Sequence, residues 1–111
     1  MKSYSIVGMS HRPGAYDILK ALEVGETVKL VREPDNEYDS NAVAVWVGGT
    51  KVGYIPSKQN KALAAFIDQT GEPMIKTAVV DSAEPGGAWA KSISAKFVRS
   101  PNSAYPMVEV E

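Results

Sequence analysis

Short runs in which apolar and polar residues alternate dominate the chain, and they predict strands. The run Thr27–Arg32 (TVKLVR) places Val28, Leu30 and Arg32 on one face of a strand. Two further β-like runs, Ala42–Val47 and Thr50–Ile55, are separated by a Gly-Gly pair. This pair predicts a hairpin, because both central residues of a tight primed turn need a positive φ. The other expected strands are Tyr4–Gly8, Met74–Ser82, Ala90–Val98 and Pro106–Glu111, with the glycine-rich stretch 84–87 between the middle two.

Helical periodicity is confined to two segments. Ser57–Asp68 follows a proline and begins with a candidate N-cap serine, and its residues Leu63, Phe66 and Ile67 share one helical face. A shorter segment, Ala15–Leu22, also has its apolar residues on one side. Many short strands with one or two short helices predict an all-β fold, either a small barrel or a rolled sheet, and not a parallel βαβ fold.

Length and composition predict one domain with a packed core. The 111 residues contain no cysteine, which excludes zinc ribbons, redox pairs and thiol nucleophiles. The net charge is −1, so the chain is not expected to coat duplex DNA through many phosphate contacts, and any nucleic-acid binding must be local. No apolar run is long enough to span a bilayer, and the N-terminal apolar stretch is too short for a signal peptide. We therefore expect a cytoplasmic protein with no membrane contact.

The segment with the most distinctive chemistry is 32–42, REPDNEYDSNA, between two expected strands. Four acidic residues alternate here with Asn36, Tyr38 and Asn41. Proline, aspartate and asparagine are turn formers, so an ordinary surface turn explains much of the pattern. Tyr38, however, is a large amphipathic side chain in an otherwise polar connection, and Asp39 lies where the chain re-enters a strand.

The sequence gives little support for a catalytic or metal-binding function. A calcium loop starting at Asp35 fails, because Ser40 stands where glycine is required and Trp46 where the bidentate glutamate should be. His11 is the sole histidine, and no nucleophile motif surrounds a serine. The glycine pairs lack the lysine of a phosphate loop. We expect no enzyme activity, cofactor or metal, although composition leaves open a magnesium-dependent nuclease that uses carboxylates alone.

The runs Leu30–Ala44 (LVREPDNEYDSNAVA) and Lys51–Pro56 (KVGYIP), with the earlier Val7-Gly8, resemble the signature of HIRAN domains. The likeness covers about residues 4–98 of a single domain spanning 1–111, with a last strand or tail at 99–111. It implies a modified OB-like β-barrel that captures the 3′-hydroxyl end of single-stranded DNA without catalysis. HIRAN domains occur in fork-remodelling helicase-like ATPases, and alone or fused to nucleases in bacteria and phages. The resemblance thus implies repair or replication, with helicase or nuclease partner proteins.

The resemblance also assigns roles to particular residues. Tyr38 and Asp39 match the family's Tyr-Asp pair that meets the terminal nucleotide, where a carboxylate accepts a hydrogen bond from a free hydroxyl and repels a phosphate. Trp89 is expected to be exposed and to stack on a base, and Trp46 to pack inside the fold. Tyr54 is expected to contact sugar or phosphate. Asn36 and Asn41 either bond base edges or cap the turn.

Basic residues are expected to contact the few bound phosphates. The candidates are Arg12, Arg32, Lys58 and Lys91, together with backbone amides at the expected helix start, Ser57–Lys58. The loop after Val7-Gly8, with Ser10, His11 and Arg12, stands where eukaryotic members present an arginine and tyrosines. His11 and Arg12 would substitute for these by stacking and by phosphate pairing. A protein-interaction adaptor and a nuclease accessory remain the alternative functions.

Overall fold

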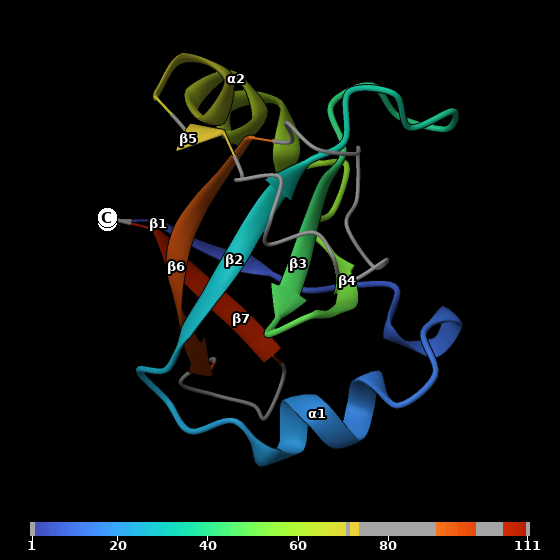
Figure 1. Cartoon of the computed structure of the whole chain (residues 1–111), viewed down its shortest axis with the longest axis vertical. Coiled ribbons are helices and arrows are strands. Elements are labelled where there is room, and N and C mark those ends of the chain that lie inside the picture. The colour runs from blue at the N-terminus through green and yellow to red at the C-terminus, as the bar shows by residue number, and fades with distance from the viewer. Residues whose placement is uncertain (1, 71, 74–90, 100–105, 111) are drawn as a thin grey trace.

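The computed structural model describes residues 2–70, 72–73, 91–99 and 106–110, and strands dominate them (Figure 1). Six strands follow one another in an antiparallel sheet in the order β1-β7-β6-β2-β3-β4, and a short strand, β5, pairs with β6 off this path. The strands are β1 Lys2–Ser5, β2 Thr27–Arg32, β3 Val43–Val47, β4 Thr50–Tyr54, β5 Glu72–Pro73, β6 Lys91–Arg99 and β7 Pro106–Val110. The helices are η1 Met9–His11, α1 Ala15–Ala21 and α2 Asn60–Thr70. This curled half-barrel with short helices confirms the predicted all-β, OB-like fold class.

Strands β3 and β4 form the predicted hairpin, and Val47 pairs with Thr50 across its turn. Of the two turn glycines, Gly48 has a positive φ of 59°, and Gly49 does not have a positive φ. A positive φ at the first central residue is typical of a type II′ turn. The hairpin was predicted correctly, but the expectation that both glycines have a positive φ is wrong.

A β-bulge and a close backbone approach bring the two ends of the sheet together. The register shifts between Val45 and Trp46, where β4 has one residue more than β3, and such a bulge increases local twist. Farther along β4, Val7 and Tyr54 each donate their backbone N–H to the other's carbonyl at 2.8 Å. A Cβ added at Gly53 would lie 2.5 Å from the carbonyl oxygen of Val7. The link between the chain after β1 and strand β4 therefore requires glycine at this position.

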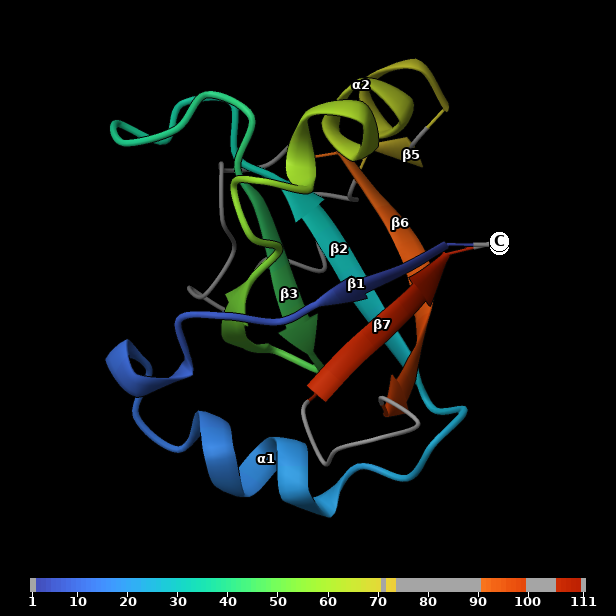
Figure 2. The same cartoon turned by 180° about the vertical axis from the view of Figure 1, so that it is seen from behind.

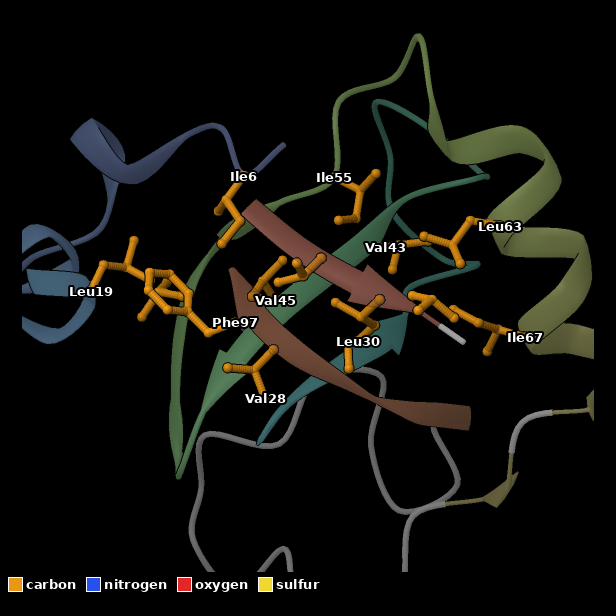
Figure 3. Packing of buried hydrophobic residues seen from close by; sticks show 14 of the residues in the cluster. Ile6, Leu19, Val28, Leu30, Val43, Val45, Ile55, Leu63, Ile67 and Phe97 are labelled. Atoms are coloured by element: carbon orange, nitrogen blue, oxygen red, sulfur yellow. The ribbon is translucent and has the colours of Figure 1, made fainter. Parts of the chain in front are cut away.

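The hydrophobic core fills the space inside the curled sheet, and the two α-helices cover opposite ends of it (Figures 1 and 2). Figure 3 shows Leu19 of α1 entering the core from one end and Leu63 and Ile67 of α2 from the other. Leu30 and Phe97 lie between them and are fully buried. Each helix buries one apolar face, so the helices stabilise the barrel from its ends. The β2–β3 connection extends outward beside α2 (Figure 1).

A second, smaller cluster lies outside this core. Val31, Ala44 and Trp46 are buried there, and the ring of Tyr54 packs against them. The expectation that Trp46 packs inside the fold is confirmed. This cluster supports Tyr54 from beneath, next to the β2–β3 connection.

Several predicted boundaries change. The first strand ends at Ser5 and not at Gly8, and Val7 forms only an isolated bridge. The second helix begins at Asn60 and not at Ser57, because 57–59 form a turn that the Gln59 N–H closes onto the carbonyl of Pro56. The predicted strand Met74–Ser82 and the stretch 84–87 lie outside the described residues. Within the described ranges, no helix has the length and apolar character needed to cross a membrane.

Candidate nucleic-acid interface

The connection 33–42, hereafter the recognition loop, extends from the end of the sheet beside α2 (Figure 1). Tyr38 lies on this loop with 90% of its surface exposed. The side-chain oxygen Oδ1 of Asn36 accepts hydrogen bonds from the backbone N–H groups of Tyr38 and Asp39, at 2.9 and 3.1 Å. Asn36 thus caps the turn, which is one of the two roles expected for it. The loop backbone is held in place while the tyrosine ring faces solvent.

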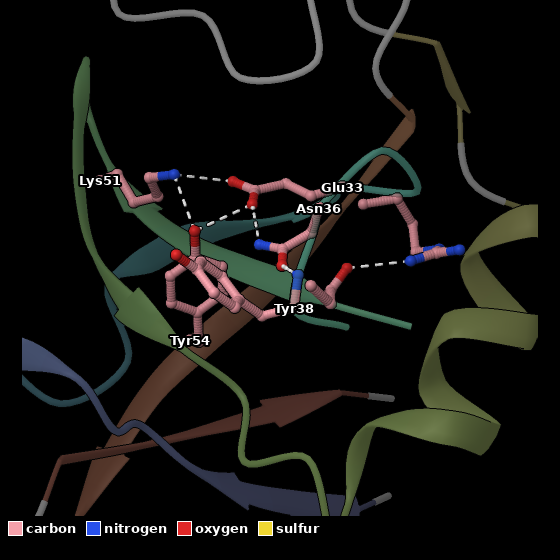
Figure 4. Close-up of polar contacts among 7 residues, drawn as sticks. Glu33, Asn36, Tyr38, Lys51 and Tyr54 are labelled. Carbon is pink, nitrogen blue, oxygen red and sulfur yellow. Dashed lines mark hydrogen bonds and ion pairs between the residues drawn. The ribbon is translucent and has the colours of Figure 1, made fainter. Parts of the chain in front are cut away.

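A polar network anchors the base of the recognition loop to strand β4 (Figure 4). Lys51 Nζ donates to Glu33 Oε2 at 2.8 Å and to the hydroxyl of Tyr54 at 2.9 Å. The Tyr54 hydroxyl and Asn36 Nδ2 donate to Glu33 Oε1, at 2.9 and 3.1 Å. Burial alone would raise the pKa of Glu33, but the hydrogen bonds from Lys51, Asn36 and Tyr54, with the charge of Lys51, lower it below the ordinary value. Glu33 is therefore a buried, ionised anchor for the loop.

Asp39 is held by two neutral donors. Its Oδ1 accepts the backbone N–H of Asn41 at 2.9 Å, and its Oδ2 accepts Nδ2 of Asn60, the first residue of α2, at 2.7 Å. An ionised carboxylate offers about four acceptor positions, so both oxygens keep one for a ligand. Asp39 as a whole is half-buried.

Arg32 lies inside the protein, with 5% of its surface exposed. Its Nε and Nη2 donate to the two carboxylate oxygens of Asp68 at 2.9 and 3.3 Å, and its Nη1 donates to the carbonyl of Ala42 at 2.9 Å. The guanidinium closes the neck of the recognition loop and ties it to α2. The expectation that Arg32 contacts phosphate does not fit this arrangement, because the group is buried and its donors face protein acceptors.

The remaining candidate residues lie in η1 and just after it, in the turn before α2, or outside the described ranges. Ser10 and His11 are exposed in η1, and Arg12 follows them half-buried. Their segment follows Gly8, where an added Cβ would lie 3.9 Å from the Tyr54 ring, and it lies beside α1, away from the recognition loop (Figure 1). Lys58 is exposed in the turn before α2, so its amide does not belong to the first turn of the helix as expected. Lys91 begins β6, but its side chain, like the whole of Trp89, is outside the described residues.

Sequence reasoning missed the residues that hold the loop in place. Glu33 looked like any of the four loop acids, and nothing local distinguished it. Lys51 had a weak signal, because it stands three residues before Tyr54 in the KVGYIP run, and both side chains reach Glu33. Asn60 and Asp68 gave no signal, since their partners are 21 and 36 residues away.

The arrangement does not suggest a metal centre. Among the residues that the structure describes, no three histidine, cysteine, aspartate or glutamate side chains gather closely enough to hold an ion. The acids of the recognition loop instead have distinct roles, with Glu33 in the anchoring network and Asp39 bound by amide donors.

Fold and site together define a small β-barrel module with one anchored loop that presents a tyrosine and a carboxylate. The chain belongs to the HIRAN domain family, whose model matches residues 1–101. It is 41% identical over 64 residues to the helicase-like transcription factor of Oryctolagus cuniculus, and this match covers 57% of the chain but 6% of that protein.

Two solved structures share the fold. A protein from Lactobacillus plantarum superposes with a TM-score of 0.68 at 24% identity, over 97% of this chain and 87% of that one. The HIRAN domain of human HLTF superposes with a TM-score of 0.59 at 22% identity, over 96% of this chain and 69% of that one.

Proposed function

We propose that this chain is a non-catalytic module that binds the 3′-hydroxyl end of single-stranded DNA at the recognition loop. The observation that carries the proposal is Tyr38, an aromatic ring 90% exposed on a loop whose backbone is fixed by Asn36. A ring presented in this way offers a stacking surface on a loop whose backbone is already ordered, and stacking one base on it contributes about 1–3 kcal/mol. Membership of the HIRAN family supports DNA as the ligand.

Asp39, next to Tyr38, supplies the selection for an end. A free 3′-hydroxyl donates a hydrogen bond to one of the remaining acceptor positions of the carboxylate, whereas a phosphate at the same place has no proton to donate and is repelled. A strand that continues past this point is disfavoured for the same reason. Arg12 and Lys58 are proposed to contact the phosphates that precede the end, and Ser10, His11 and Tyr54 to line the approach. Trp89 and Lys91 stay in the proposal on the sequence argument alone.

The test compares two short oligonucleotides that differ only in a 3′-hydroxyl or a 3′-phosphate, by fluorescence anisotropy. We expect tighter binding of the hydroxyl form by about tenfold, equivalent to ~1.4 kcal/mol. Asp39→Asn should shrink this preference, because it removes the repelling charge. Asp35→Asn is the matched control, since it removes one exposed charge from the same loop without touching Asp39. Equal affinity of the wild-type protein for both oligonucleotides would contradict end selection.

The nuclease alternative is tested with the same DNA. Labelled oligonucleotide is incubated with the protein over a Mg²⁺ titration, and we expect it to stay intact. Cleavage that rises with Mg²⁺ would show that the module is catalytic. Within a cell, we propose a role beside a helicase or nuclease partner in replication or repair. The name of the relative from Oryctolagus cuniculus, helicase-like transcription factor, supports the helicase part of this proposal.

A further inference from the structure

The first residue of α2, Asn60, reaches the carboxylate on which end selection depends. It is 2% exposed, and its Nδ2 donates to Asp39 Oδ2 at 2.7 Å, the shortest hydrogen bond of the recognition loop among the described residues. We propose that Asn60 is a positioning residue that sets the hydroxyl selectivity of the site through Asp39. This inference rests on the proposed function and deepens it.

Asn60 restricts the orientation of the carboxylate. The terminal torsion of an aspartate side chain is broad and weakly restrained by itself. Here the backbone N–H of Asn41 holds one oxygen and Asn60 holds the other, from two different elements. The two donors together fix the plane of the carboxylate, and so the direction of its remaining acceptor positions. A terminal hydroxyl then meets an acceptor that is already oriented.

Asn60 carries no charge, which is as important for the proposed selectivity as its hydrogen bond to Asp39. In the part of the chain that the structure describes, Glu33 is bound by Lys51 and Asp68 by Arg32, and Asp39 has no cation within ion-pair distance. An amide donor can orient the carboxylate of Asp39 without cancelling its charge. A lysine or arginine in the same place would neutralise the charge that repels a phosphate. The acids that anchor the structure, Glu33 and Asp68, are thus paired with cations. The acid proposed to select the ligand, Asp39, is held by amide groups instead.

Helix α2 also provides a matched control. Asp68, eight residues after Asn60, accepts the bonds from Arg32 and so ties the neck of the recognition loop to the same helix. Both contacts join the loop region to α2, but Asn60 contacts the selecting carboxylate and Asp68 does not. A purely structural role for Asn60 predicts that both contacts affect DNA binding in the same way.

The experiment measures affinity for the 3′-hydroxyl and 3′-phosphate oligonucleotides, and the ratio of the two, alongside thermal unfolding. Asn60→Leu removes the donor and keeps a side chain of similar size, and Asn60→Gln keeps an amide. We expect Asn60→Leu to bring the affinity ratio close to equality, and Asn60→Gln to retain more of it. Asp68→Asn should lower the melting temperature and weaken both oligonucleotides alike, so that its ratio stays at the wild-type value.

The outcomes separate the two proposals. If the wild-type protein prefers the hydroxyl and Asn60→Leu keeps that preference, the role of Asn60 is refuted while end selection stands. If the wild-type protein shows no preference, end selection fails and the inference fails with it. A Leu variant that weakens both oligonucleotides equally, as Asp68→Asn is expected to do, identifies Asn60 as structural and also overturns the inference.

Discussion

Replacing Tyr38 by alanine separates binding from folding more cleanly than any other change at this site. The side chain is 90% exposed, so its removal should change the free energy of unfolding by no more than about 0.5 kcal/mol, as is usual for surface positions. If one base stacks on the ring, the loss of binding energy is about 1–3 kcal/mol, or roughly a 5- to 150-fold weaker Kd. Tyr38→Phe keeps the ring and should keep most of the affinity.

Fluorescence anisotropy with a labelled 3′-hydroxyl oligonucleotide measures this effect, and thermal unfolding of the same samples checks the fold. Tyr16→Ala is the matched control, because Tyr16 is also an exposed tyrosine, at 55%, on helix α1 at the opposite end of the barrel (Figure 1). Its loss should leave DNA affinity unchanged. Wild-type affinity in Tyr38→Ala would refute the stacking role. An equal loss of affinity in Tyr38→Ala and Tyr16→Ala would show that the effect is not specific to the recognition loop.

Three other predictions concern the barrel, its pH dependence and its response to salt. Gly53→Ala places a Cβ 2.5 Å from the carbonyl oxygen of Val7 and should destabilise the fold by about 1–3 kcal/mol, so an unchanged melting temperature would contradict the proposed closure. The lowered pKa of Glu33 means that its ionised form stabilises the protein above the ordinary value of 4.5, and that this contribution is lost as the pH falls through the lowered value. Glu33→Gln should therefore have a lower free energy of unfolding than the wild type at pH 7, and this difference should shrink in acid. Urea unfolding at several pH values measures the difference, and a difference that does not change with pH would argue against the network. With few phosphate contacts, the slope of log K against log salt should be no steeper than about −2, and a much steeper slope would indicate an extended basic surface.

The sequence predicted the elements whose signals are local. The hairpin of β3 and β4 follows from two β-like runs around a glycine pair, and the core face of α2 follows from the spacing of Leu63 and Ile67. Alternation in β2 even placed Arg32 on the face of Leu30, which is the core face. The phosphate contact expected for Arg32 rested on its position beside an unusual loop. The alternation of residues in β2, which places Arg32 on the core face, argues against that contact.

What the sequence did not reveal depends on contacts between distant segments. Glu33 became the anchor of the recognition loop only because the hairpin carries Lys51 and Tyr54 back beside it. Asn60 meets Asp39 because α2 covers the end of the barrel from which the loop extends. Periodicity and turn chemistry describe residues that are close along the chain. They therefore cannot predict the contacts of Glu33 with Lys51 and Tyr54, or of Asn60 with Asp39, which depend on the folded sheet.

The charges of the recognition loop indicate why an acidic segment suits a DNA end better than a DNA backbone. Of its four acids, Glu33 is the one that a cation binds among the described residues, while Asp35 and Glu37 are exposed on either side of Asn36, just before Tyr38. A strand running along the loop would bring successive phosphates towards these uncompensated charges, and each would be repelled. In the proposed binding mode, a terminal nucleotide would place its base on Tyr38 and its hydroxyl at Asp39, and its phosphate would be directed back along the strand and away from the loop. The acidity that makes a duplex coat implausible for this chain therefore favours a ligand that enters by its end.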